Sequence, residues 1–183
     1  MKPIADVRVR EVLGRRFSAE LKLFKLPRTA VFSLRLPSAR VVVPEGSGFV
    51  GVTFVSSGQL RTFSPGCGSP REAGTSHVIN HEDYEYYFTS DEDLDSMAIC
   101  FHKPLLHKYA QTFSGRTDSQ LLKPAVDLDL DSNAGACFAR YAHFVWDELN
   151  RGGALVRSPL ATEEIEDSLW ALLLSAVQGQ SGE

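Results

Sequence analysis

The residues that decide the fold are Ala98-Ile99-Cys100-Phe101-His102-Lys103-Pro104-Leu105-Leu106, where the sequence pattern changes its period. From Gly46 to Phe101 the chain reads as short strands that are interrupted by Gly, Pro and Ser. From Pro104 to Val177 it reads as amphipathic helices, with no strand-like stretch of comparable strength. Strands followed by helices favour a small sheet or barrel with a helical extension, and they argue against an alternating βαβ enzyme.

The composition indicates one globular domain, or one domain with an appendage. The chain has 183 residues, of which 43% are hydrophobic and 23% are charged, and this length is sufficient to bury a real core. A formal net charge of -4 argues against nucleic-acid binding by this chain alone, because phosphate binding needs a basic face. No apolar run approaches the roughly 18 residues of a membrane span, and no secretion signal opens the chain. We therefore expect a cytoplasmic protein with no membrane contact.

Charged and sulfur-containing residues add two further expectations. The basic residues near the N-terminus are Lys2, Arg8, Arg10, Arg15, Arg16, Lys22, Lys25 and Arg28. A solvated edge strand explains them most simply, since charges protect sheet edges, and a phosphate contact is the alternative. Cys67, Cys100 and Cys137 are far apart and form no CxxC motif, so we expect Cys100 and Cys137 to be core thiols in a reducing compartment.

The strand region contains one segment that is apolar on both faces, Phe49-Val50-Gly51-Val52-Thr53-Phe54-Val55. Such a strand is buried on two sides, as in a barrel wall that is covered by helices. Turn signals such as Ser56-Ser57-Gly58 recur at intervals of about 8 to 12 residues, which favours a closed or rolled antiparallel sheet.

The helical region begins at Pro104 and contains two longer helices. Ser132 or Asn133 can cap a helix that reaches Asn150, and Ser158-Pro159 can begin the last helix. Both helices have more apolar positions than one barrel face needs, which suggests a second surface that meets a partner in a two-fold dimer. The candidate interface residues are Tyr141, Phe144, Val145, Glu148, Ile165, Leu169, Leu172 and Leu173. The alternative is that both stripes are intramolecular, and an exposed Trp170 would favour the interface.

The order of elements resembles the sensor half of AraC/XylS-family bacterial transcription regulators. The resemblance rests on 52–58, on Gly74-Thr75-Ser76-His77-Val78-Ile79, on the exit at 98–106 and on Leu169-Trp170-Ala171-Leu172-Leu173-Leu174. It covers roughly positions 10 to 178, as a pattern of spacing and residue type. These regulators normally continue with two helix-turn-helix units, and no such pattern occurs here. We therefore expect a sensor portion without its DNA-binding half.

The resemblance implies a mainly β fold with a helical extension (α+β). A cupin-like antiparallel β-barrel would occupy residues 1–102, three or four helices would form a dimerisation region over 103–178, and 179–183 would be a loose tail or the start of a linker. It implies a homodimer that binds a small-molecule effector and contacts DNA only through the missing C-terminal domain. The alternatives are a cupin-type enzyme that acts on a small molecule and an oligomerisation module without a ligand.

A barrel interior of this composition suits a small apolar or aromatic acid. The candidate ligand-binding residues are Phe32, Arg40, Phe49, Phe54, Arg61, Phe63 and His77. The phenylalanines would line the wall, and an arginine fork would match a carboxylate of the effector. Core packing of each Phe and a surface position of each Arg are the alternatives.

The sequence offers no convincing catalytic or metal site. Cupin metal sites need an H-x-H pair, a nearby Glu and a later His, and this chain has no H-x-H pair. The segment Asp127-Leu128-Asp129-Leu130-Asp131 lacks the Gly and the distal Glu of a Ca²⁺ loop, so it reads as an edge strand or a solvated loop. No nucleophile elbow or P-loop occurs. We therefore expect a non-enzymatic protein with no catalytic residues, no metal and no cofactor.

Overall fold

The computed structural model describes residues 8–12, 18–43, 48–63, 70–71, 76–80, 86–90, 93–114, 126–153 and 157–179. The strands of this part are β1 (Arg8–Val12), β2 (Glu20–Lys25), β3 (Thr29–Leu36), β4 (Ala39–Val43), β5 (Phe49–Ser57), β6 (Leu60–Phe63), β7 (Pro70–Arg71), β8 (Ser76–Asn80), β9 (Tyr86–Ser90), β10 (Leu94–His102) and β11 (Val126–Asp127). The helices are α1 (Lys103–Ser114), α2 (Asn133–Arg151) and α3 (Pro159–Gly179). Strands precede the helices except for the short β11, so the predicted α+β fold with a helical extension is confirmed.

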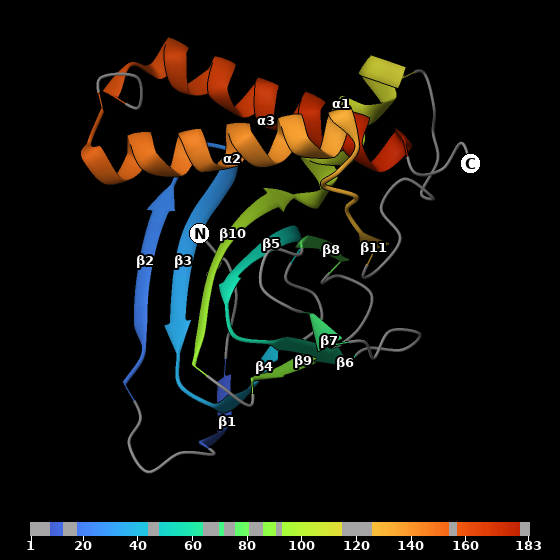
Figure 1. Cartoon of the computed structure of the whole chain (residues 1–183). Coiled ribbons are helices and arrows are strands. Elements are labelled where there is room, and N and C mark those ends of the chain that lie inside the picture. Colours follow the sequence, from blue (N-terminus) through green and yellow to red (C-terminus); the bar gives the residue numbers. More distant parts are fainter. Residues whose placement is uncertain are drawn as a thin grey trace.

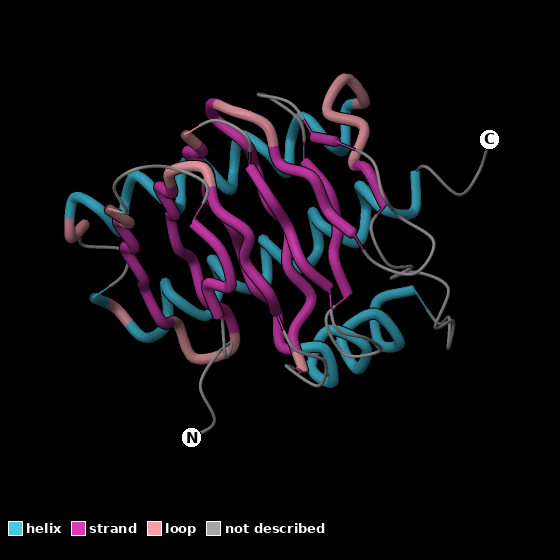
Figure 2. The backbone as a smooth tube through the Cα atoms, turned by 90° about the horizontal axis from the view of Figure 1, so that it is seen from below, coloured by secondary structure: helices cyan, strands magenta, loops and turns pink. Residues whose placement is uncertain are grey.

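The described strands form two antiparallel sheets. A six-stranded sheet has the order β11-β8-β5-β10-β3-β2, and a five-stranded sheet has the order β1-β4-β9-β6-β7. Helices α2 and α3 lie over the six-stranded sheet, and the five-stranded sheet lies at the opposite end of the molecule (Figure 1). The view from below shows the strands in front of the helices (Figure 2). Of the closed or rolled antiparallel sheet that the sequence predicted, the closed form is corrected: the described strands form two separate hydrogen-bonded sheets.

Strand β5 occupies an inner position of the six-stranded sheet, between β8 and β10. Val50 and Val52 are fully buried beneath the helices, and Gly51 and Val55 are buried on the other face of the strand. The two-sided burial that the sequence predicted for this strand is confirmed. Its cause is that helices cover one face of the sheet while the other face turns inward.

The main core lies between the six-stranded sheet and the helices. Val31, Val52 and Ile99 are paired across three neighbouring strands, and all three are fully buried in this core. Phe138 from α2 and Leu169 from α3 belong to the same core and are also fully buried. Burial of each such side chain contributes about 1.5 to 3 kcal/mol, so the helices share one hydrophobic core with the sheet.

The helix ends follow the capping pattern that the sequence predicted. The Ser132 hydroxyl oxygen accepts a hydrogen bond from the Gly135 N–H at 3.0 Å, so of the two candidates Ser132 is the N-cap of α2. Gly152 ends α2 with φ 62°, a left-handed conformation that favours glycine. Ser158 precedes α3 and accepts the Ala161 N–H on its side chain at 3.4 Å.

The cysteines and the helix lengths complete the description. Cys100 is buried and Cys137 is half-buried, while Cys67 lies outside the described residues. None of the helices in the described ranges combines the length and apolar character that crossing a bilayer would require.

Candidate functional site

The face of the six-stranded sheet that is turned away from the helices carries the candidate site. Ala98 pairs with Phe32 on one side and with Thr53 on the other. The next row along the strands, Val31, Ile99 and Val52, lies in the core beneath the helices. Because side chains alternate along a strand, Phe32, Ala98 and Thr53 point to the opposite face of the sheet. Thr53 in turn pairs with His77, so the register brings His77 into the same row, although its side chain lies outside the described part.

A second row on this face lies at the end of β10. Phe49 pairs with His102, and their rings meet edge to face with centroids 5.6 Å apart. Between the two rows, Cys100 pairs with Ala30 and with Gly51. The sheet therefore presents a floor of small residues between Phe32 and Phe49. Burial raises the pKa of the Cys100 thiol to about 12, so the thiol is uncharged at neutral pH.

The five-stranded sheet carries three more residues for which the sequence predicted a role in ligand binding, Arg40, Arg61 and Phe63. Arg40 and Arg61 both pair with Thr89, from opposite sides of β9. Two strand spacings place their backbones about 10 Å apart, with the side chains on one face of the sheet.

Ala39 and Leu60, which precede the two arginines in β4 and β6, are buried, and Leu60 packs with Val55 of the six-stranded sheet. Strand alternation therefore turns Arg40 and Arg61 away from the six-stranded sheet, which corrects their assignment to a binding site inside the fold. Both arginines are half-buried and both already have an interaction partner. Phe63 follows Arg61 by two residues and pairs with Tyr87, and its side chain lies outside the described part.

Phe54 does not belong to this site, which corrects the sequence-based expectation. Its ring lies 5.9 Å from that of Phe138 and 5.5 Å from that of His143, both on α2. Phe54 is an even-numbered residue of β5, like Val50 and Val52, so strand alternation turns it toward the helices. It is a core residue at the contact between the sheet and the helices.

The candidate interface residues divide into two groups. Val145, Leu169 and Leu173 are fully buried and Ile165 is 5% exposed, all within the chain's own core. These four cannot offer surface to a partner, so their assignment to an interface is wrong. Trp170 is also buried, at 2% exposure, and it therefore gives no support to the interface.

The other four candidates lie at or near the surface and stay predictions. Phe144 is 41% exposed, and its ring centroid is 5.8 Å from that of Tyr141. Glu148 is half-buried one turn further along α2, and Leu172 is half-buried on α3. The spacing of the three α2 residues places them on one stripe of the helix.

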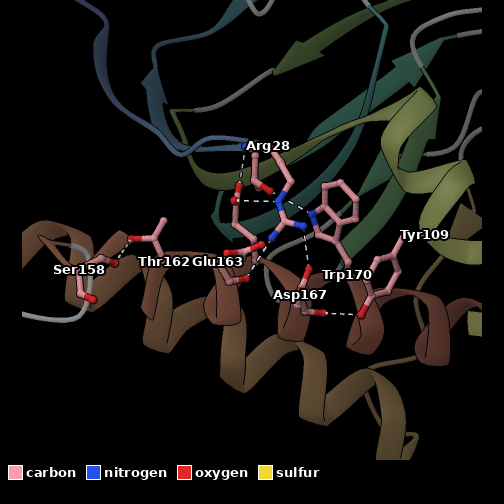
Figure 3. A network of polar contacts seen from close by, with 9 residues as sticks. Arg28, Tyr109, Ser158, Thr162, Glu163, Asp167 and Trp170 are labelled. Atoms are coloured by element: carbon pink, nitrogen blue, oxygen red, sulfur yellow. Dashed lines mark hydrogen bonds and ion pairs between the residues drawn. The ribbon is translucent and has the colours of Figure 1, made fainter. Parts of the chain in front are cut away.

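A polar network between the β2–β3 turn and α3 is a feature that the sequence did not reveal (Figure 3). The Arg28 Nε atom lies 3.1 Å from Oε2 of Glu166, and the Arg28 Nη1 atom lies 2.8 Å from Oδ1 of Asp167. The guanidinium also donates to the Glu163 carbonyl at 3.0 Å and stacks over Trp170 at 5.0 Å. Burial lowers the pKa of Arg28. The hydrogen bonds to Asp167 and Glu166 and the charges of both carboxylates raise it by more, so the pKa of Arg28 lies above its usual value.

This network corrects the interpretation of Arg28 as part of a solvated edge or a phosphate contact. The residue binds carboxylates of its own chain instead. Arg28 and Glu166 are separated by 138 positions, so no spacing rule links them. The available sequence signals were an arginine after Pro27 and the Glu163, Glu166 and Asp167 carboxylates at helical spacing.

The described residues also bear on the metal question. Within these ranges, no group of three His, Cys, Asp or Glu side chains is close enough to hold a metal ion. Buried polar atoms without a hydrogen-bond partner in the described part are Ser76 Oγ and His102 Nδ1. The Asp129 side chain accepts hydrogen bonds from the N–H groups of Asp131 and Ser132, so it closes a turn before α2, as the sequence-based reading of a loop implied.

Comparison with known proteins identifies the family. The model of the AraC-binding-like domain matches residues 4–174, so the chain belongs to the AraC-binding-like domain family. A search of curated proteins returned no match. Among solved structures, the AraC-like transcriptional activator CuxR matches with a TM-score of 0.72 at 16% identity. That match covers 96% of this chain and 62% of CuxR, so this chain spans less than two thirds of that regulator. At this identity the likeness concerns the fold.

Two weaker structural matches cover about half of this chain or less. A putative ethanolamine utilization protein Q from Salmonella typhimurium has a TM-score of 0.41 and 12% identity, over 46% of this chain and 70% of its own. The Cupin_2 domain of an XRE family regulator from Enterobacter cloacae has a TM-score of 0.39 and 16% identity, over 45% of this chain and 95% of its own. We derive no functional statement from either.

Proposed function

We propose that this chain is the effector-sensing and dimerising part of an AraC-like transcription regulator that works in the bacterial cytoplasm. The observation that carries the proposal is the AraC-binding-like family match over residues 4–174. The fold of an AraC-like activator, which this chain matches over 96% of its length, supports it. The DNA-binding half would be a C-terminal domain outside this sequence, and the sensor would act by binding rather than by catalysis.

The proposed effector is a small aromatic acid that lies between the two sheets. Phe32 and Phe49 would contact its ring, above the floor of small residues that their strands provide. His102 would donate a hydrogen bond to its carboxylate, because its buried Nδ1 has no hydrogen-bond partner among the described residues and its ring lies beside Phe49. His77 would lie at the edge of the site by its register with Thr53.

Residues 1–102, which contain every described strand except β11, would act as the sensor, and residues 103–178 would form the dimerisation region. Tyr141, Phe144 and Glu148 on α2, together with Leu172 on α3, would form the contact between two copies. A two-fold dimer buries the same patch on both subunits, and the exposed aromatic side chain of Phe144 is of the type that interfaces favour. The effector would favour one arrangement of sheets and helices, and so change how the DNA-binding halves are presented.

A thermal-shift panel tests effector binding. Benzoate, salicylate, phenylacetate and hexanoate would be compared with benzamide, which lacks the carboxylate. A ligand at about one hundred times its Kd adds about 2.7 kcal/mol, which corresponds to a rise of about 5 to 10 °C for a domain of this size. We expect at least one aromatic acid to reach that range and benzamide to have no effect.

Variants assign the binding to the proposed site. Phe32→Ala and His102→Phe should abolish the shift, while Arg35→Gln should retain it, because Arg35 is exposed and paired with Asp95 at 2.8 Å. An equal loss with Arg35→Gln, or no response to any acid, would contradict the effector proposal. Stoichiometric Fe, Mn or Zn bound by histidines in the purified protein would overturn the non-catalytic role.

Sedimentation equilibrium tests the dimer. Phe144→Asp should weaken self-association at least about tenfold, a free-energy change of about 1.4 kcal/mol. Leu160→Asp is the matched control, since Leu160 is 69% exposed on α3 and lies outside the proposed contact. A wild-type protein that remains monomeric, or equal effects of the two substitutions, would contradict this interface.

A further inference from the structure

We propose that Arg28 is a positioning residue that couples the pocket end of β10 to helix α3. The inference rests on the proposed effector site, because it describes how a change in that site would reach the helices. Arg28 lies in the turn between β2 and β3, and two of its backbone groups contact different elements. Its N–H donates to Glu166 Oε1 at 2.7 Å, and its carbonyl accepts the His102 N–H at 3.5 Å.

On the strand side, the hydrogen bond to the Arg28 carbonyl comes from a residue of the proposed effector site. His102 is the last residue of β10, and its ring lies edge-on to Phe49, with centroids 5.6 Å apart. The two residues are also direct partners in the sheet. A ligand that displaces the Phe49 ring would therefore move His102, and with it the donor to the Arg28 carbonyl.

The helix side of the connection is broad. The Arg28 guanidinium binds Glu163, Glu166 and Asp167, which all lie in the first half of α3. It also stacks over Trp170, one turn further along the helix. A shift of the β2–β3 turn would thus act on more than one turn of the helix.

Trp170 of α3 provides a second connection between the helix and the strands. Its Nε1 donates to Thr29 Oγ1 at 3.0 Å, and its ring lies 6.4 Å from Phe101 and 5.5 Å from Tyr109. One side chain of α3 therefore contacts β3, β10 and α1 beside Arg28 (Figure 3). Packing of this kind moves as a unit, because close-packed cores switch between discrete arrangements and do not deform continuously.

The burial of Glu166 makes the coupling strict. Its side chain is 0% exposed, and a buried carboxylate is strongly destabilised once its partner leaves. The turn and the helix must therefore keep their contact when either one moves. Helix α3 also carries Leu172 of the proposed dimer contact, so the route joins the pocket to that surface.

Hydrogen exchange of the whole chain, followed by mass spectrometry without any ligand, tests this coupling. Phe49→Ala perturbs the pocket end directly. We expect it to raise exchange in peptides of α3 roughly two- to thirtyfold, the range of coupling found between sites in other proteins. In an Arg28→Lys background, which keeps the charge but removes the fork, Phe49→Ala should change β5 and β10 as before but produce a clearly smaller response in α3, where only the Trp170 contacts and the backbone bond to Glu166 remain.

The matched control is Arg35→Lys, an exposed arginine of β3, in which the effect of Phe49→Ala on α3 should persist. If Arg28→Lys does not fold, Asp167→Ala removes one guanidinium partner and should reduce the same effect. An α3 response of equal size in the Arg28→Lys background, or no α3 response in the wild-type background, would overturn the coupling. Because no ligand is used, this failure is distinguishable from a negative thermal-shift panel.

Discussion

The guanidinium of Arg28 and the carboxylate of Glu166 form an ion pair that joins the turn between β2 and β3 to helix α3. Nε of Arg28 lies 3.1 Å from Oε2 of Glu166, and the Arg28 backbone N–H donates to Oε1 at 2.7 Å. The side chain of Arg28 is 24% exposed and that of Glu166 is 0% exposed. Among the described residues, Arg28 in the β2–β3 turn thus donates a hydrogen bond to each of the two carboxylate oxygens, and these bonds offset the cost of burying the charge.

Replacement of Arg28 should therefore destabilise the fold strongly. Arg28→Ala leaves the Glu166 charge buried without its partner, and we expect the free energy of unfolding to fall by about 3 kcal/mol. Urea unfolding measures this change. Arg35→Ala removes an exposed guanidinium that pairs with Asp95, and it should leave stability nearly unchanged. Equal losses for the two variants would show that the Arg28 pair has no special role.

Two phenylalanines on α2 should respond differently to the same substitution. Phe138 is 0% exposed and Phe144 is 41% exposed. Phe138→Ala should lower the free energy of unfolding by about 3 to 5 kcal/mol, because it leaves a cavity between helix and sheet. Phe144→Ala should change the stability of the monomer by less than about 0.5 kcal/mol. The reverse order in thermal or urea unfolding would place the wrong face of α2 in the core.

At Gly135, in the first turn of α2, helix propensity and close packing predict opposite effects of a substitution to alanine. A Cβ atom at this position would clash with the Asp129 carbonyl oxygen. Gly135→Ala should therefore destabilise the protein by about 1 to 3 kcal/mol, as overpacking does. Helix propensity alone predicts a gain of about 1 kcal/mol, so a stabilised variant in urea unfolding would mean that the loop before α2 does not lie against the helix.

Cys100 should give the protein a specific loss of stability at alkaline pH. Burial raises the pKa of its thiol from 9.0 to about 12, so the folded state keeps a proton that the unfolded state releases. The stabilisation is complete below pH 9 and is lost as the pH rises toward 12, with a slope of up to about 1.4 kcal/mol per pH unit.

Unfolding free energies measured across this pH range in Cys100→Ala test the assignment. This variant should lose less stability than the wild type as the pH rises, while Cys137→Ala, which retains Cys100, should follow the wild type. Parallel curves for all three proteins would show that the Cys100 thiol is not shielded from water.

The fold could be predicted from the sequence because its signals are local. The change of period near Phe101, the cap at Ser132 and the two-sided burial of β5 each depend on neighbouring residues. Neighbouring residues do not determine which surface an apolar side chain contacts in the folded protein. An apolar stripe on a helix looks the same whether it meets a sheet or a partner, which explains why buried residues such as Leu169 were assigned to an interface.

The site needed the strand order as well. Phe32 and His77 are brought into one row only because β10 and β5 lie between β3 and β8. Phe54 was misplaced because a strand that is apolar on both faces does not indicate which face meets the helices. The partnership of Arg28 with Glu166 joins positions 138 apart, and no periodic pattern reports a contact of that range.

The central claim is that a small acid binds between the sheets, against the face of the six-stranded sheet that is turned away from the helices. Its most direct test is to titrate the acids of the panel into isotopically labelled protein and to map the chemical-shift changes by NMR. The account predicts that the largest changes occur at Thr53, Ala98 and Cys100, on the face of the sheet that carries Phe32 and Phe49. Changes confined to the outer face of α2 around Phe144, or no change with any acid, would contradict it.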